Sequence, residues 1–193
     1  MNAVKRTSQP AGPHRIARDA EDYPGTLRSR LSENAPRELI VLGDRSLLRL
    51  RKTALYCSAR TPGDAILRAH DAARRMRDEG VTVISGFHSP IERECLRILL
   101  RGKQPLIICP ARAIEAMRVP TEARDAFDAG RVLIVSPFSA TPKRITKESA
   151  VRRNEVVAAL ANEAYIAHVE PGGGTARITQ MLELWNVRRL DRA

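Results

Sequence analysis

The stretch VTVISGFHSPIERECLRILLRG, residues 81–102, decides the fold, because a buried strand and an amphipathic helix follow each other there with only a short turn between them. Residues 81–85 form a β-branched run without alternating polar side chains, which is typical of a parallel strand covered on both faces. The run ends in a serine and a glycine, Ser85 and Gly86. We therefore expect the strand to stop at this pair.

The helix that follows has a clear beginning at Ser89. Serine is a favoured N-cap, Pro90 suits the first helical position, and Glu92 completes the pattern of a capping box. An apolar stripe with helical period follows at Ile91, Cys95, Ile98 and Leu99. Strand, glycine turn and helix make the βα unit of a doubly wound fold, in which ligands bind beyond the carboxyl ends of the strands and helix N-termini attract anions. The turn before Ser89 is therefore predicted to be a phosphate site.

The same alternation of strand and helix continues along the chain. Apolar runs predict strands at 38–42, 53–57, 81–85, 105–109, 131–135 and 164–169. Helices are predicted at 64–79 and at 149–161. Three more are predicted: one that begins at residue 89, one that ends at residue 130 and one that follows the glycines at 172–174. This order indicates an α/β, Rossmann-like doubly wound fold with a mostly parallel sheet and helices on both faces. Residues 21–193 are expected to form this single domain, and the basic residues 1–20 a disordered arm.

Composition favours a polyanionic partner. The 193 residues include 33 Lys and Arg against 22 Asp and Glu, a formal net charge of +11, although a basic surface that serves only solubility would have the same balance. No apolar run approaches a membrane span and no secretory signal is recognised, so we expect a cytoplasmic protein without membrane contact. The three cysteines lie far apart and no histidines pair at ligand spacing, which predicts buried thiols, no metal site and no cofactor.

A parallel sheet collects the segments that follow its strands on one edge. Here these segments contain small, basic and aromatic residues, which suit phosphates and the faces of bases. The alternative for Phe87 and Phe138 is a place in the core. The predicted residues for binding DNA or phosphate are Ser58, Arg60, Ser85, Gly86, Phe87, His88, Arg112, Phe138, Lys143, Arg144, Arg153, Asn154, Gly172, Gly173, Gly174 and Thr175.

In order and spacing, several motifs resemble those of the DNA-processing protein A family, also called DprA or Smf. They are Tyr23-Pro24, IVLGDRSLL at 40–48, S-x-R at 58–60, SGFHSPIERECLRILLRG at 85–102, VSPFSATP at 135–142 and RRNEVVAALANEAYIAHVEPGGGT at 152–175. The resemblance implies a Rossmann-like core that binds single-stranded DNA without catalysis, acts in DNA processing, recombination and DNA uptake, helps to load the RecA recombinase and forms a homodimer. It also implies that Ser58, Arg60, Ser85 and Gly86 border the DNA pocket, with Arg153-Asn154 opening a helix.

The chain also departs from that family's pattern. Cys57 occupies the position of the family's glycine before S-x-R, and Ser89-Pro90-Ile91-Glu92 replaces its G-x-D. Cys109-Pro110-Ala111 replaces its G-S-G, and Ser136-Pro137 replaces its S-E. The family's closing strand and its winged-helix domain are expected to be absent. These differences describe a divergent or short relative.

A second resemblance keeps an enzyme among the alternatives. EPGGGT at 170–175 is similar to the P-G-G-x-G-T motif of the "Lonely Guy" family, whose members split nucleoside monophosphates at the glycosidic bond. The position of that family's catalytic glutamate falls on Arg177 or Ile178, and Glu170 precedes the turn. A nucleoside monophosphate phosphoribohydrolase and a non-catalytic nucleotide sensor therefore stay as alternatives to DNA binding.

Overall fold

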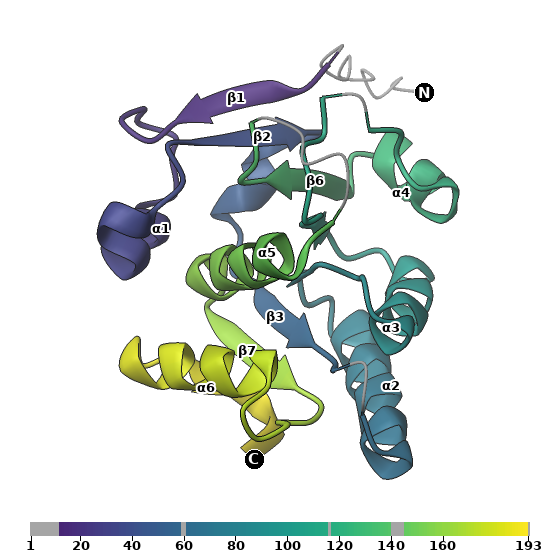
Figure 1. Ribbon diagram of the computed structural model, residues 1–193. Helices are drawn as coiled ribbons and strands as arrows, with labels where there is room; N and C mark the ends of the chain where they lie inside the picture. The colour runs from purple at the N-terminus through teal and green to yellow at the C-terminus, as the bar shows by residue number, and fades with distance from the viewer. Residues whose placement is uncertain (1–11, 59–60, 116, 140–144, 193) are drawn as a thin grey trace, which may run out of the picture.

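The centre of the protein is an eight-stranded sheet with the order β1-β2-β6-β5-β4-β3-β7-β8, seen in a computed structural model that describes residues 12–58, 61–115, 117–139 and 145–192 (Figure 1). Its strands are β1 His14–Ala17, β2 Glu38–Leu42, β3 Thr53–Tyr56, β4 Val83–Ser85, β5 Leu106–Ile108, β6 Val132–Ser136, β7 Glu163–Ile166 and β8 Arg188–Arg189. Strands β6, β5, β4, β3, β7 and β8 run parallel. Strand β2 is antiparallel to β6, and β1 is antiparallel to β2.

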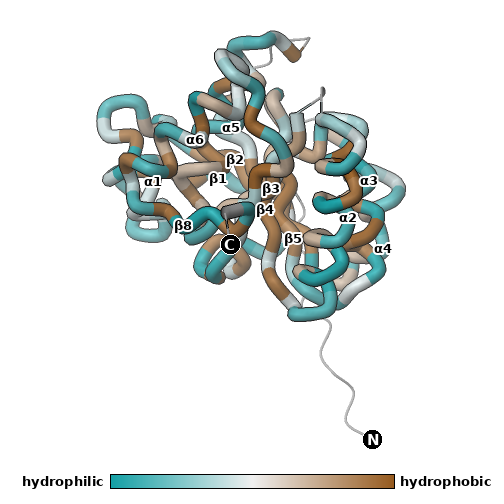
Figure 2. The backbone as a smooth tube through the Cα atoms, turned by 90° about the horizontal axis from the view of Figure 1, so that it is seen from below, coloured by the Kyte–Doolittle hydropathy of each residue, from teal (hydrophilic) through white to brown (hydrophobic). Residues whose placement is uncertain are grey.

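Helices cover both faces of this sheet. They are α1 Gly25–Leu31, α2 Gly63–Asp78, α3 Pro90–Leu100, α4 Arg124–Asp128, α5 Lys147–Leu160 and α6 Gly174–Leu184, with short 3-10 turns η1 Ser32–Asn34, η2 Arg45–Arg49, η3 Thr121–Ala123 and η4 Leu190–Arg192. Figure 2 shows α1, α5 and α6 on one side of the apolar strands and α2, α3 and α4 on the other. The expected doubly wound fold is confirmed.

Two apolar clusters fill the space between the sheet and its two helix layers. Successive residues of β6 alternate between them, because side chains of a strand point to opposite faces. Leu133 and Val135 belong to the cluster beneath α1, α5 and α6, whereas Val132 and Ile134 belong to the cluster beneath α2, α3 and α4. A strand buried on both faces has no polar alternation, which explains why the sequence shows these strands as continuous apolar runs.

The sheet reverses its direction of growth beside β3. From β3 the chain adds β4, β5 and β6 in turn, then crosses back through α5 and places β7 on the free side of β3. The carboxyl ends of β3 and β7 therefore flank the switch point, the place where doubly wound folds bind ligands. None of the described helices is long and apolar enough to cross a membrane.

Two edge strands differ from the sequence expectations. Residues 14–17, expected within a disordered arm, form β1, and Ile16 is buried against the core. Arg188–Arg189, where no closing strand was expected, pairs with β7 as β8. Each strand is held by backbone hydrogen bonds to a neighbour and carries little apolar character of its own, so the sequence shows no periodic signal for it.

Candidate nucleic-acid interface

The segments that follow the parallel strands lie along one edge of the sheet. We call this the strand-end edge and define it as residues 57–58, 86–89, 109–112, 137–138 and 167–175, which follow β3, β4, β5, β6 and β7. Neighbouring strands are spaced by about 4.8 Å, so the edge from β6 to β7 is about 19 Å long. This length suits an extended ligand better than a single phosphate.

The turn between β4 and α3 is occupied by a side chain of the protein itself. Glu92 Oε2 accepts hydrogen bonds from His88 N at 2.8 Å and Ser89 N at 3.4 Å, and Oε1 accepts one from Cys57 N at 3.2 Å. The residue is only 7% exposed. These backbone groups belong to two neighbouring strand ends and are the donors that an external phosphate needs. The phosphate site expected in this turn is therefore already filled by a carboxylate.

Arg153 of α5 covers the same turn. Its Nη1 donates to Cys109 O at 3.2 Å, and the residue is only 4% exposed. A Cβ at Gly86 would lie 1.4 Å from Nη1, so the missing side chain of Gly86 makes room for the guanidinium. Nε has no hydrogen-bond partner, and among the described residues Arg153 forms no ion pair with a carboxylate. A buried cation without a counterion is unfavourable, and a bound anion would offset that cost.

The Phe87 side chain belongs to the core. It is 6% exposed and packs in the apolar cluster beneath α2 and α3, so its ring is not available to stack on a base. Its backbone has φ +47°, a conformation that residues other than glycine rarely adopt. Phe87 N donates to the Oγ of Ser85 at 3.3 Å, and Ser85 itself is fully buried. This placement corrects the stacking role expected for Phe87 and makes Ser85 a structural residue of the turn.

The ends of β5 and β6 are joined by Ser136. Its Oγ donates to Arg112 O at 2.7 Å and accepts from Phe138 N at 3.1 Å. The Arg112 side chain is exposed and forms no ion pair among the described residues, and Phe138 is half-buried. Arg112 therefore offers a free cation, and Phe138 offers part of an aromatic ring, on the strand-end edge.

The glycine turn after β7 is a compact loop that begins α6. Gly172 has φ +71°, Gly173 N donates to Glu170 O at 3.0 Å, and Glu170 N donates to Thr175 Oγ1 at 3.3 Å. Gly172 and Gly174 are exposed, whereas Gly173 and Thr175 are half-buried. The turn therefore presents backbone with little side chain, as the sequence predicts for a close approach.

The two positions of the "Lonely Guy" glutamate hold no carboxylate. Arg177 Nη2 donates to Glu155 Oε1 at 2.7 Å, and Ile178 is buried in the core. Glu155 also lies 3.5 Å from Arg152, so its carboxylate is held between two cations. Neither position therefore supplies a carboxyl group that could assist departure of the base.

The remaining predicted residues are placed as follows. Ser58 and Asn154 are half-buried, and Asn154 O accepts from Tyr56 Oη at 2.9 Å, which ties α5 to β3. His88 is exposed, and Gly86 is half-buried under Arg153. Arg60, Lys143 and Arg144 lie outside the described residues.

The thiols near the edge are protonated at neutral pH. A hydrogen bond with the Cys95 side chain, followed by burial, raises the pKa of Cys57, and burial raises the pKa of Cys109 to about 12. Thiolates are the nucleophilic and metal-binding form, so neither cysteine is activated. In the part of the chain that the structure describes, no group of three His, Cys, Asp or Glu side chains is arranged to hold a metal ion.

Two features of this edge have no direct signal in the sequence. The capping box predicts that Glu92 begins a helix, but its bond to Cys57 N joins residues that lie 35 positions apart. The contact of Arg153 with Gly86 likewise depends on how α5 crosses the sheet. A glutamate at the third helical position after a glycine turn is the one sequence signal that indicates an internal anion there.

Together these elements define a Rossmann-like domain whose carboxyl edge carries cations, glycines and an aromatic residue around a switch point. The chain belongs to the DNA recombination-mediator protein A family, whose family model matches residues 14–184. No curated protein matches the chain in sequence.

Two solved structures share this fold. DNA processing protein A (DprA) from Streptococcus pneumoniae superposes with a TM-score of 0.73 at 17% identity, over 95% of this chain and 62% of that chain. DNA processing protein A from Helicobacter pylori has a TM-score of 0.71 at 18% identity, over 92% of this chain and 79% of that chain, and its structure was described for a single-stranded DNA binding mode. The present chain thus spans 62% of the length of the pneumococcal protein.

The role of Glu92 is tested by Glu92→Ala. We expect the free energy of unfolding to fall by about 2–3 kcal/mol, because buried backbone donors lose a charged acceptor. The control is Arg93→Ala at an exposed position of the same helix, which should change the stability by no more than about 0.5 kcal/mol. Urea denaturation of both variants measures the difference, and equal losses would show that Glu92 is an ordinary surface carboxylate.

Proposed function

We propose that this chain binds single-stranded DNA along the strand-end edge, without catalysing a reaction. The observation that carries the proposal is a pair of cations, Arg112 exposed on this edge and Arg153 of α5 buried beneath it, which form no ion pair with a carboxylate among the described residues. Phosphates are the ligands that such arginines neutralise in nucleic acids. Membership of the family and the net charge of +11 support the same ligand.

The filled turn at Glu92 favours a strand over a mononucleotide. A single nucleotide phosphate in a doubly wound fold depends on backbone N–H groups at a helix N-terminus, and here His88 N and Ser89 N already donate to Glu92. A strand instead distributes its phosphates over several strand ends. Arginines, the half-buried ring of Phe138 and the open glycine backbone suit that distributed contact.

The proposal extends to the setting that the family resemblance implies. In it the protein acts in the cytoplasm, as a homodimer, in DNA processing, recombination and DNA uptake, and passes single-stranded DNA to the RecA recombinase. The strand-end edge supports the DNA-binding step of this scheme. The nucleotide sensor is the competing function, and the experiments below separate the two.

Arg112→Gln should weaken the binding of all single-stranded oligonucleotides alike and make the salt dependence shallower. Each neutralised phosphate contributes a log–log slope of about −0.7 for single strands, so loss of one contact removes about that amount. Fluorescence anisotropy with labelled oligonucleotides between about 50 and 200 mM salt measures both effects.

Arg101→Gln is the matched control, because Arg101 is exposed in the turn before β5, at the opposite edge of the sheet. This substitution should leave the affinity for oligonucleotides and the slope of its salt dependence unchanged. Arg60→Ala is the second test and should act as Arg112→Gln does. If Arg60→Ala abolished the binding of a mononucleotide and left oligonucleotide affinity and slope intact, the nucleotide sensor would replace DNA binding.

Phe138→Ala should lower the affinity for oligonucleotides without changing the slope, because a stacking ring carries no charge. The expected loss is on the order of 1–3 kcal/mol for one base. Thermal melting alongside the binding isotherms distinguishes the two roles of this half-buried ring. A lower melting temperature with unchanged affinity would place Phe138 in the core and remove it from the interface.

Nucleoside monophosphates incubated with the protein should release no free base. The reason is that the positions expected for a catalytic glutamate are an ion-paired arginine and a buried isoleucine, Arg177 and Ile178. Chromatography of the incubation mixtures measures release. Turnover that disappears in Glu170→Gln would instead establish the hydrolase alternative.

A further inference from the structure

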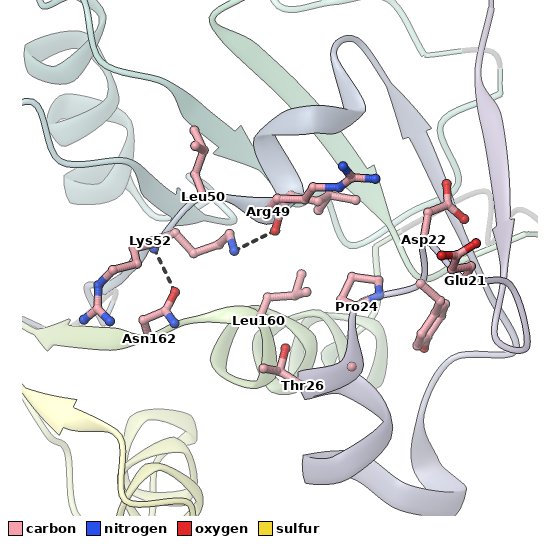
Figure 3. Close-up of a pocket in the computed structure, with 13 residues that line it drawn as sticks. Glu21, Asp22, Pro24, Thr26, Arg49, Leu50, Lys52, Leu160 and Asn162 are labelled. Carbon is pink, nitrogen blue, oxygen red and sulfur yellow. Dashed lines mark hydrogen bonds between the residues drawn. The ribbon is translucent and has the colours of Figure 1, made fainter.

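A cavity of about 830 Å³ lies at the opposite edge of the sheet, beside the amino ends of β3 and β7 (Figure 3). Segments from η2, from the start of α1 and from the end of α5 line it. Its volume lies within the range of about 300–1,000 Å³ typical of small-molecule sites. It does not share any residue with the strand-end edge.

Lys52 supplies the buried charge of this cavity. Its backbone is fixed by Asn162, since Lys52 N donates to Asn162 Oδ1 at 3.0 Å and Lys52 O accepts from Asn162 N at 2.9 Å. The residue is 6% exposed, and its Nζ donates to Leu48 O at 2.9 Å. Among the described residues Nζ forms no ion pair with a carboxylate, and an ammonium group has three donors.

The ammonium is charged under physiological conditions. Burial, followed by the nearby Arg30, lowers the pKa of Lys52 to about 8, so most molecules still carry the charge at pH 7. Removal of a cation from water without a counterion is unfavourable. An anion bound in the cavity would therefore offset the cost of burying the Lys52 ammonium.

The two ends of the cavity differ in charge, and both apolar and charged side chains lie between them. Figure 3 shows Lys52 and Asn162 at one end, Glu21 and Asp22 at the other, and Leu160 between them. Arg49 and Arg51 also line the cavity, and Asp22 is ion-paired with Arg45 at 3.3 Å, so the lining carries more cations than free carboxylates and favours an anion. Because Leu50 and Leu160 line it as well, the cavity suits a small anion with an apolar part.

We propose that this cavity binds a small organic acid, with its carboxylate on the Lys52 ammonium and its apolar body against Leu50 and Leu160. The contacts that carry the proposal are the buried Nζ with one carbonyl partner and the apolar lining beside it. The site is independent of DNA binding, because it lies at the other edge of the sheet.

The fluorescent anion 8-anilinonaphthalene-1-sulfonate is the probe, and octanoate is the competitor. Octanoate should displace the probe, whereas octanol, which has a similar chain and no charge, should not. Lys52→Met retains the volume of the side chain and should weaken octanoate binding at least about tenfold, the loss expected for one charge-assisted hydrogen bond. Lys103→Met, at an exposed lysine outside the cavity, should bind as the unaltered protein does.

Thr26→Trp is a second variant, which leaves Lys52 intact and fills the cavity from α1. It should also lose octanoate binding, while thermal melting shows that both variants are folded and anisotropy shows that both still bind oligonucleotides. The proposal is overturned if octanol competes as well as octanoate, if Lys52→Met binds octanoate normally, or if the unaltered protein binds neither probe nor octanoate.

Discussion

The carboxylate of Glu92 joins two neighbouring strand ends, and the shape of the strand-end edge depends on that contact. Its two oxygens accept from Cys57 N after β3 and from His88 N and Ser89 N before α3. In many doubly wound proteins the same backbone groups are left for a ligand. Here the Glu92 carboxylate accepts their hydrogen bonds, so the turn keeps its conformation without a bound molecule.

Closure of the turn changes what the rest of the edge can recognise. With the backbone donors in use, the groups left to a ligand at this edge are side chains, among them Arg112 on the surface and Arg153 beneath it. Arg153 can lie there only because residue 86 has no Cβ. Charge neutralisation by arginines carries no sequence information, so an interface of this kind would hold a strand by its backbone and tolerate many base sequences.

Most of the fold could be predicted because its signals are local. Strands buried on both faces appear as apolar runs, and Ser89, Pro90 and Glu92, which lie within one stretch of four residues, mark the start of α3. The edge strands β1 and β8 had no such signal, since their stability comes from pairing with a neighbour. The site is harder to predict from the sequence, because it depends on contacts between distant parts of the chain. These are the contacts of Glu92 with Cys57 and of Arg153 with Gly86. Phe87 shows the remaining difficulty, since an aromatic residue after a strand looks alike in sequence whether it faces a ligand or the core.

The left-handed backbone of Phe87 has a consequence for motion. A residue with a Cβ pays about 1–2 kcal/mol for this conformation, and the buried ring offsets that cost by packing beneath α2 and α3. The turn therefore keeps its shape only while the ring stays in place, and the ring stays in place only while the two helices remain docked. The amide hydrogens of Cys57 and His88 should then exchange with solvent together, at the rate at which this part of the core opens, so the edge and the core behave as one cooperative unit.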